Sequence, residues 1–244
     1  MFLDYFFYSK KRIPKILKPN YLNRHKGEYF LILANGRSII QNQNTINQYI
    51  KKFNPIIMGS NFAPLDYELN YHVFTNRSRF SRYSNKIKKN SKILLSPYFK
   101  KSLIKSKISK TYEELSFINE CLFQKNNIKR LEIKNGIINC NMRTVALLSI
   151  AIAFVMGAKK VFLAGLDGYD LNNMNNKKYF TNYYGNDLKY PGKHKDLEYF
   201  SHFHELNEIT LKYLKELDYF FRKENLANYF QIITPTFFDK FYKK

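Results

Sequence analysis

Several features that would assign this chain of 244 residues to a common functional class are absent or scarce. Its two cysteines, Cys121 and Cys140, do not have the spacing of a metal site, and we interpret them as reduced thiols of a cytoplasmic protein. The longest apolar run, Val145 to Met156, is too short to span a bilayer. Asp4 lies among the first apolar residues and no basic region precedes them, so the start of the chain is a poor signal peptide. We therefore expect a cytoplasmic enzyme or binding protein.

The short motifs of several large enzyme classes are also missing. There is no Gly-x-Gly-x-x-Gly fingerprint and no Walker loop, which excludes the usual dinucleotide and P-loop phosphate sites. A Gly-x-Ser-x-Gly elbow, which would indicate a hydrolase, is absent as well. No Asp-x-Asp dyad supports a metal-dependent sugar-nucleotide site, and we expect no metal.

Acidic residues are few: 19 Asp and Glu stand against 41 Lys and Arg, a net charge of +22. Cationic surfaces attract nucleic acid, but the basic residues look scattered, and no RRM, zinc-finger or helix-turn-helix signature accompanies them. The abundance of Lys, Asn, Ile, Tyr and Phe is what an AT-rich coding sequence produces. A local concentration runs from Lys10 to Lys18, beside the N-terminal aromatic residues. For it we rank a solvated arm first, peripheral contact with an anionic inner membrane second, and nucleic-acid binding last.

The chain does contain the alternating pattern of an α/β domain, which begins after a basic and aromatic arm at residues 1–28. Strand-like runs occupy residues 29–34, 55–60, 71–75, 92–96, 159–164 and 229–234. Helical patterns cover 45–53 with Thr45 as N-cap, 143–157, 206–222 and, less regularly, 100–135. We predict a single Rossmann-like α/β domain over residues 29–244 with a mostly parallel sheet.

Residues 171–195 interrupt this pattern with a segment rich in Asn, Lys and Tyr. A long irregular insertion after a strand of a parallel sheet commonly forms a lid or a binding loop. Disorder is the competing interpretation, although four aromatic residues between Tyr179 and Tyr184 favour some packing. We expect a lid-like insertion.

Polar residues follow several of the predicted strands where each ends. In open α/β sheets ligands bind at these carboxyl ends. The alternative is that Asn and Gly simply make turns there. Ser38 is placed to cap the next helix, whose N–H groups suit a phosphate. The candidate binding residues are Asn35, Gly36, Ser38, Asn61, Asn76, Asp167 and Tyr169.

A further candidate anion site precedes the apolar helix at 143–157. Arg143 and the Thr144 hydroxyl lie at its predicted N-terminus, where free N–H groups attract an anion. Capping alone explains the threonine but explains the arginine less easily.

Three of the five histidines cluster at His194, His202 and His204, and histidine is the usual general base near neutral pH. Metal binding is the rival interpretation, but no settled carboxylate partner accompanies them. His25 and His72 are expected to be surface or strand residues.

Taken in order, these segments resemble the bacterial sialyltransferases that decorate lipooligosaccharide. In that family a strand is followed by Gly-Asn-Gly-Pro-Ser-Leu, to which residues 34–39 are similar. The second and third strands end in Cys-Asn-Gln-Phe and Val-Phe-Tyr-Asn, as residues 60–62 and 73–76 do approximately. A Thr-Ser-Gly turn, an alanine-rich helix and Leu-Ser-Gly-Ile-Asp-Phe-Tyr follow, and residues 144–169 look like the same succession.

The resemblance implies a metal-independent glycosyltransferase that uses a CMP-activated acidic sugar, of sialic acid or keto-deoxy type, to build surface polysaccharide or lipooligosaccharide. It implies that Asn35, Asn61 and Thr144 contact CMP and that Tyr169 contacts its phosphate. The catalytic base falls within residues 201–209, and we favour His204 over His202. The partners would be a nucleotide-sugar donor and a glycan or glycolipid acceptor, while nothing in the sequence indicates an oligomeric state.

A second resemblance links residues 32–39, 54–62 and 71–77 to the domain that trails aldolase-like enzymes of bacterial surface-polysaccharide clusters. Two other functions remain open at this stage. A non-catalytic domain could bind a nucleotide or scaffold polysaccharide assembly. A pterin-type diphosphokinase would need a magnesium-binding carboxylate cluster, for which only Asp167 and Asp170 are available.

Overall fold

The computed structural model describes residues 16–17, 20–61, 67–115, 131–139, 142, 144–169 and 196–242. The strand at 16–17 and residues 196–203 of the last helix are described by their backbone alone. The predicted lid at 171–195, together with Arg143 and Asp170, lies outside the described residues.

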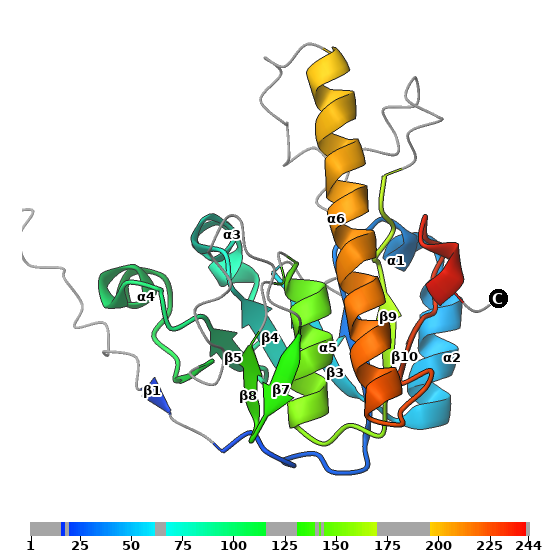
Figure 1. Cartoon of the computed structure of the whole chain (residues 1–244). Coiled ribbons are helices and arrows are strands. Elements are labelled where there is room, and N and C mark those ends of the chain that lie inside the picture. Colours follow the sequence, from blue (N-terminus) through cyan, green and yellow to red (C-terminus); the bar gives the residue numbers. More distant parts are fainter. Residues whose placement is uncertain are drawn as a thin grey trace, which may run out of the picture.

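Eight parallel strands form one sheet in the order β1-β6-β5-β4-β3-β2-β9-β10 (Figure 1). Successive strands run outward from β2 through β6, and the chain then returns to place β9 on the other side of β2. The strand order therefore reverses between β2 and β9, which is where doubly wound sheets bind ligands. The strands are β1 (Ile16–Leu17), β2 (Tyr29–Leu33), β3 (Ile56–Ser60), β4 (Tyr71–Phe74), β5 (Lys92–Leu95), β6 (Tyr112–Glu114), β9 (Lys160–Ala164) and β10 (Phe230–Ile232).

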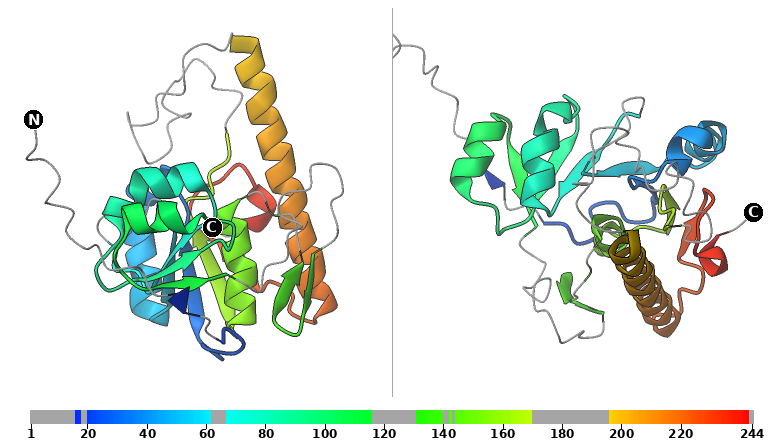
Figure 2. Two further views of the ribbon diagram at one scale, coloured as in Figure 1. Left: turned by 90° about the vertical axis from the view of Figure 1, so that its left-hand side faces the viewer. Right: turned by 90° about the horizontal axis from the view of Figure 1, so that it is seen from above.

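Helices cover both faces of the sheet, as Figure 2 shows in the view from above. On one face lie α1 (Ser38–Gln41), α2 (Gln43–Phe53), α3 (Arg77–Tyr83) with the 3₁₀ turn η1 (Ser84–Lys86), and α4 (Lys101–Lys107). On the other lie α5 (Val145–Val155) and α6 (Asp196–Lys223). A hairpin of β7 (Glu132–Lys134) and β8 (Ile137–Asn139) and a final 3₁₀ turn η6 (Asp239–Phe241) complete the elements.

Side chains of the central strands alternate between the two faces of the sheet and so belong to two separate core clusters. Phe30 and Ile32 of β2 pack toward α5, whereas Leu31 and Leu33 pack toward α2. Because both faces are covered, the strand is apolar without interruption. Helix α5 is buried nearly all round, since α6 lies on it and adds residues such as Leu214 to the same cluster.

The predicted α/β fold with a parallel sheet is confirmed, and each of the six predicted strands is present. Three local predictions are wrong. Asn42, not Thr45, is the N-cap of α2, and Ser38 is the first residue of α1 instead of its cap. The described part of residues 100–135 is mostly not helical, because α4 ends at Lys107 and the chain then forms β6 and β7.

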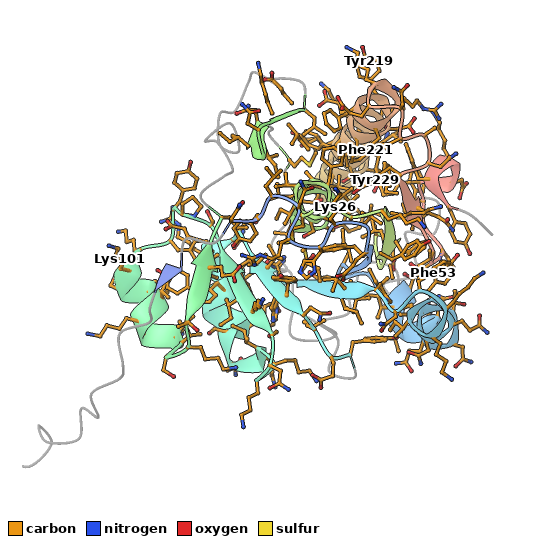
Figure 3. All side chains as sticks on the ribbon, turned by 90° about the horizontal axis from the view of Figure 1, so that it is seen from below. Lys26, Phe53, Lys101, Tyr219, Phe221 and Tyr229 are labelled. Carbon is orange, nitrogen blue, oxygen red and sulfur yellow. The ribbon has the colours of Figure 1, made fainter. Side chains whose placement is uncertain are left out.

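Residues 20–28 belong to the packed domain although the predicted arm extends to residue 28. Three of their N–H groups donate to the end of α5: Asn23 to Val155 O at 2.9 Å, His25 to Met156 O at 2.7 Å and Gly27 to Gly157 O at 2.8 Å. Arg24 forms an ion pair with Glu113 of β6 at 2.7 Å. This segment therefore covers the amino-terminal ends of the central strands, and Figure 3, which is seen from below, labels Lys26 there.

Candidate functional site

A polar cleft of about 350 Å³ lies at the carboxyl ends of β2, β3, β4 and β9, at the point where the strand order reverses. Residues as remote in the sequence as Ala34 and Phe238 meet there, because the carboxyl ends of parallel strands share one edge. Of the predicted site residues, the cleft is lined by Asn35, Gly36, Asn61, Asn76, Thr144, Asp167 and Tyr169.

The turn between β2 and α1 forms one wall of the cleft. The N–H groups at the start of α1, which could bind an anion, are bound by the Asp167 carboxylate. Asp167 accepts hydrogen bonds from the Ser38 N–H at 2.8 Å and the Ser38 hydroxyl at 2.5 Å, and from the backbone of Arg37. Gly36 makes the approach possible, because a Cβ there would overlap Asp167 Oδ1. The N–H groups that a Rossmann fold usually offers to a pyrophosphate are therefore occupied.

Ser38 does not line the cleft, which corrects its assignment as a ligand-binding residue. Its hydroxyl lies 2.9 Å from Thr234 Oγ1, which also accepts the Gly165 N–H at 2.9 Å. Burial raises the pKa of Asp167, while the hydrogen bonds from Ser38 and Arg37 oppose that shift. The Ser38 and Asp167 side chains act together to hold the β2–α1 turn against the end of β9.

The ends of β2 and β3 are joined by Asn35, whose amide donates to Ser60 O at 2.8 Å. Asn61 follows with a left-handed backbone, φ +54°, which asparagine tolerates better than most residues. Among the described residues, the buried Ser60 Oγ and Asn61 Oδ1 have no hydrogen-bond partner. Both residues line the cleft, but these two oxygens are themselves buried beneath its surface.

His72 holds the Asn61 backbone from behind the cleft. Its Nε2 lies 2.5 Å from Asn61 O, which requires the neutral ring to carry its proton on Nε2. The side chain is fully buried, and burial lowers the pKa of His72 to about 4. His72 is a strand residue, as one of the two sequence-based alternatives predicted.

The N-terminus of α5 faces the cleft from the other side of the sheet. The Thr144 hydroxyl accepts from Leu147 N at 3.2 Å and caps the helix. Val145 and Ala146 line the cleft, and as the first two helical residues their N–H groups have no acceptor within the helix. These donors, at the positive end of the helix dipole, suit one phosphate or carboxylate group.

The loop after β9 is fixed by Asn207 of α6, which the sequence analysis did not single out. Its Oδ1 accepts from Tyr169 N at 2.9 Å and its Nδ2 donates to Tyr169 O at 2.7 Å. Phe237 N adds a bond to Asp167 O at 2.7 Å. The approach of Asn207 could not be read from the sequence, since nothing local marks it as facing this loop.

Asn76 and Arg79, at the start of α3, also line the cleft. Asn76 is the N-cap of α3 and accepts from Arg79 N at 3.0 Å, so its side chain already has a structural role. Arg79 lines the cleft and supplies a cation there. No sequence motif identifies Arg79, although Asn76, as a helix cap after a strand, indicates that the residues following it begin a helix near the cleft.

The predicted catalytic base is not among the residues that line the cleft. His204 is exposed on α6, three residues before Asn207. Three residues of helix correspond to about 4.5 Å along the axis, which places the His204 backbone near the rim. His194 and the side chain of His202 lie outside the described part of the chain.

A larger hollow of about 560 Å³ lies along α6, between Leu131 and residues such as Lys215 and Tyr219. It contains none of the predicted site residues and lies away from the strand ends. Within the described ranges, no group of three or more His, Cys, Asp or Glu could hold a metal ion, and no helix is long and apolar enough to cross a bilayer.

Comparison of the chain with family models, curated proteins and solved structures gives no significant match.

Proposed function

We propose that the cleft binds a CMP-activated acidic sugar and that the protein transfers this sugar to a glycan or glycolipid acceptor, without a metal, in the synthesis of surface polysaccharide or lipooligosaccharide. The observation that carries the proposal is the convergence of Asn35, Asn61 and Thr144 on one cleft at the strand reversal. These are the three positions that the resemblance to sialyltransferases assigns to CMP.

The distribution of anion-binding groups supports a nucleoside monophosphate over a dinucleotide. Asp167 occupies the N–H groups at the start of α1, where a pyrophosphate would otherwise bind. The N-terminus of α5 offers one remaining anion position, with Arg79 also in the cleft. A CMP-sugar carries a single phosphate, which matches one such position.

The oxygens of Ser60 and Asn61 complement this anion site. Both oxygens are buried at the cleft wall, and rotation of either side chain toward the cleft would let it accept from a donor group, such as the amine of a base or a ribose hydroxyl. A ligand that supplies those donors removes the cost of leaving buried acceptors unpaired.

In the proposed reaction His204 takes the proton of the acceptor hydroxyl as its oxygen attacks the anomeric carbon. The bond from that carbon to the phosphate oxygen breaks, and CMP leaves as an anion stabilised by the α5 N-terminus and Arg79. This role requires the acceptor to lie over the rim of the cleft, since His204 is exposed there.

Replacement of His204 tests the catalytic role. His204→Ala is expected to abolish turnover of CMP-sialic acid, or of a CMP-linked keto-deoxy sugar, while CMP affinity is retained. Glu205→Ala, at the neighbouring exposed position, is the matched control and should keep full turnover. Equal turnover in both variants would remove His204 from the mechanism.

A second function, a non-catalytic nucleotide-binding or scaffolding domain, is favoured by one observation: His204 does not line the cleft. Under this function the wild-type chain binds CMP and transfers no sugar from either donor, so the same assay separates the two.

A further inference from the structure

One segment without acids concentrates positive charge, which qualifies the interpretation of the basic residues as scattered. Residues 77–110 contain twelve Lys and Arg and no Asp or Glu, so this segment alone supplies more than half of the net charge of +22. No acid lies between Leu69 and Tyr112. A coding bias toward lysine does not by itself remove every acid from such a stretch.

The fold gathers these charges on one surface. Helices α3 and α4 lie side by side on the same face of the sheet in both views of Figure 2, and their apolar residues Phe80 and Ile104 share one core cluster. The charged side chains remain outside that cluster. Exposed cations of this surface are Arg77, Arg82, Lys86, Lys89, Lys100, Lys101, Lys105 and Lys107. We call them the α3–α4 basic surface, and Figure 3 shows Lys101 at its margin.

The segment brings no acid of its own to this surface. Lys110 binds the carbonyl oxygens of Lys88 and Lys89 at 3.0 Å each and so ties two basic loops together. Its pKa is lowered by burial and then by the charge of Lys89. Of the two acids of β6, Glu113 is paired with Arg24, and Glu114 is partly exposed at the end of the strand.

We infer that the α3–α4 basic surface docks the protein on a bilayer that contains anionic phospholipid. Each lysine near such a surface adds attraction, which salt weakens. Lysine predominates over arginine here. The compact ammonium charge of lysine suits a diffuse layer of anionic headgroups, whereas the guanidinium group of arginine suits individual bidentate partners.

The entry of the chain into the sheet supports a lipid partner. Strand β1 pairs with β6 at the sheet edge, and α4 immediately precedes β6. The sequence that leads into β1 contains Phe2, Phe6 and Phe7 followed by Lys10–Arg12. Aromatic and basic residues together are typical of membrane-interface segments, and this sequence joins the domain beside the basic surface.

The aromatic residues of the segment argue against single-stranded nucleic acid. Phe80, Tyr83 and Phe99 are buried and only Tyr98 is partly exposed, so the segment provides no row of aromatic platforms on which successive bases could stack. Helix α3 also connects this surface with the cleft, because Arg79 of α3 lines the cleft. A bilayer contact here would present the cleft mouth to a lipid-linked molecule.

Vesicle sedimentation with the full chain tests this inference independently of nucleotide binding. At near-physiological salt we expect binding to vesicles of phosphatidylcholine and phosphatidylglycerol in a molar ratio of about two to one, and little binding to phosphatidylcholine alone. Replacing Lys100, Lys101, Lys105 and Lys107 by Gln should weaken binding by at least about tenfold. The matched control makes the same replacement at Lys51, Lys52, Lys212 and Lys215, exposed lysines of α2 and α6, and should change binding less than about threefold.

Three results would overturn the inference: no salt-sensitive binding to the anionic vesicles, an equal loss in the two quadruple variants, or tighter binding to a short single-stranded DNA than to vesicles. Thermal unfolding of both variants, within about 3 °C of the wild type, confirms that they are folded.

Discussion

The Asp167 carboxylate binds the backbone N–H and the hydroxyl of Ser38, 129 positions earlier in the chain. This contact occupies the start of α1 with a group of the protein itself. The N-terminus of α5 is then the helix start that still offers N–H groups to an anion in the cleft, and the contact links the ends of β2 and β9 at the strand reversal.

Asp167→Asn should destabilise the fold by about 1–3 kcal/mol, because the amide replaces an acceptor that faces several donors. Urea unfolding at pH 7 measures the loss. Asp218→Asn removes the ion pair with Arg222 on the outer part of α6 and should cost less than about 1 kcal/mol. Equal losses in the two variants would show that Asp167 does not organise the turn.

Gly36→Ala should be severely destabilising, by more than about 3 kcal/mol. The added Cβ would overlap Asp167 Oδ1 and lie 2.5 Å from Gly165 O, and the backbone oxygen has little room to move. Gly27→Ala is the control for backbone strain alone, since Gly27 has φ +83° and nothing within 4 Å of a Cβ. It should cost about 1 kcal/mol. Thermal unfolding compares the two, and a Gly36 variant as stable as the Gly27 variant would contradict the packing of this turn.

His72 should make the fold sensitive to mild acid. Its pKa is about 4 in the folded protein against about 6.5 in the unfolded chain, so between these values only the unfolded state takes up the proton. Stability due to His72 is complete above pH 6.5 and should fall by about 2–3 kcal/mol by pH 4.5. Urea unfolding at pH 7.0, 5.5 and 4.5 measures this slope.

His72→Gln should flatten the slope, and His204→Ala, at an exposed histidine, should leave it unchanged. An unchanged slope in His72→Gln would mean that another group is responsible.

The parallel strands could be predicted because β2 reads Phe30-Leu31-Ile32-Leu33, apolar on both faces, and short polar turns follow. Strand β6 could not, because it contains Glu113 and Glu114. Burial of Glu113 depends on Arg24, 89 positions away, and a local pattern carries no trace of such a partner.

The same distinction separates the parts of the site. Asn35, Asn61 and Thr144 follow strands or start a helix, so the topology brings them together once the fold is known. Ser38 was misassigned because its partner Asp167 is remote, and Asn207 was missed for the same reason. Positions at element ends are predictable, whereas the direction of a side chain depends on what a distant segment offers it.

Calorimetric titration of CMP into a matched pair of variants tests the central claim most directly. Asn61→Asp places a negative charge in the cleft with no change of size and a residue that tolerates the left-handed backbone. Asn54→Asp makes the same change at another left-handed position, the exposed C-cap of α2. The account predicts that the wild type and Asn54→Asp bind CMP equally and that Asn61→Asp binds at least about tenfold more weakly. Absence of binding to the wild type at millimolar CMP, or equal affinity in the two variants, would contradict it.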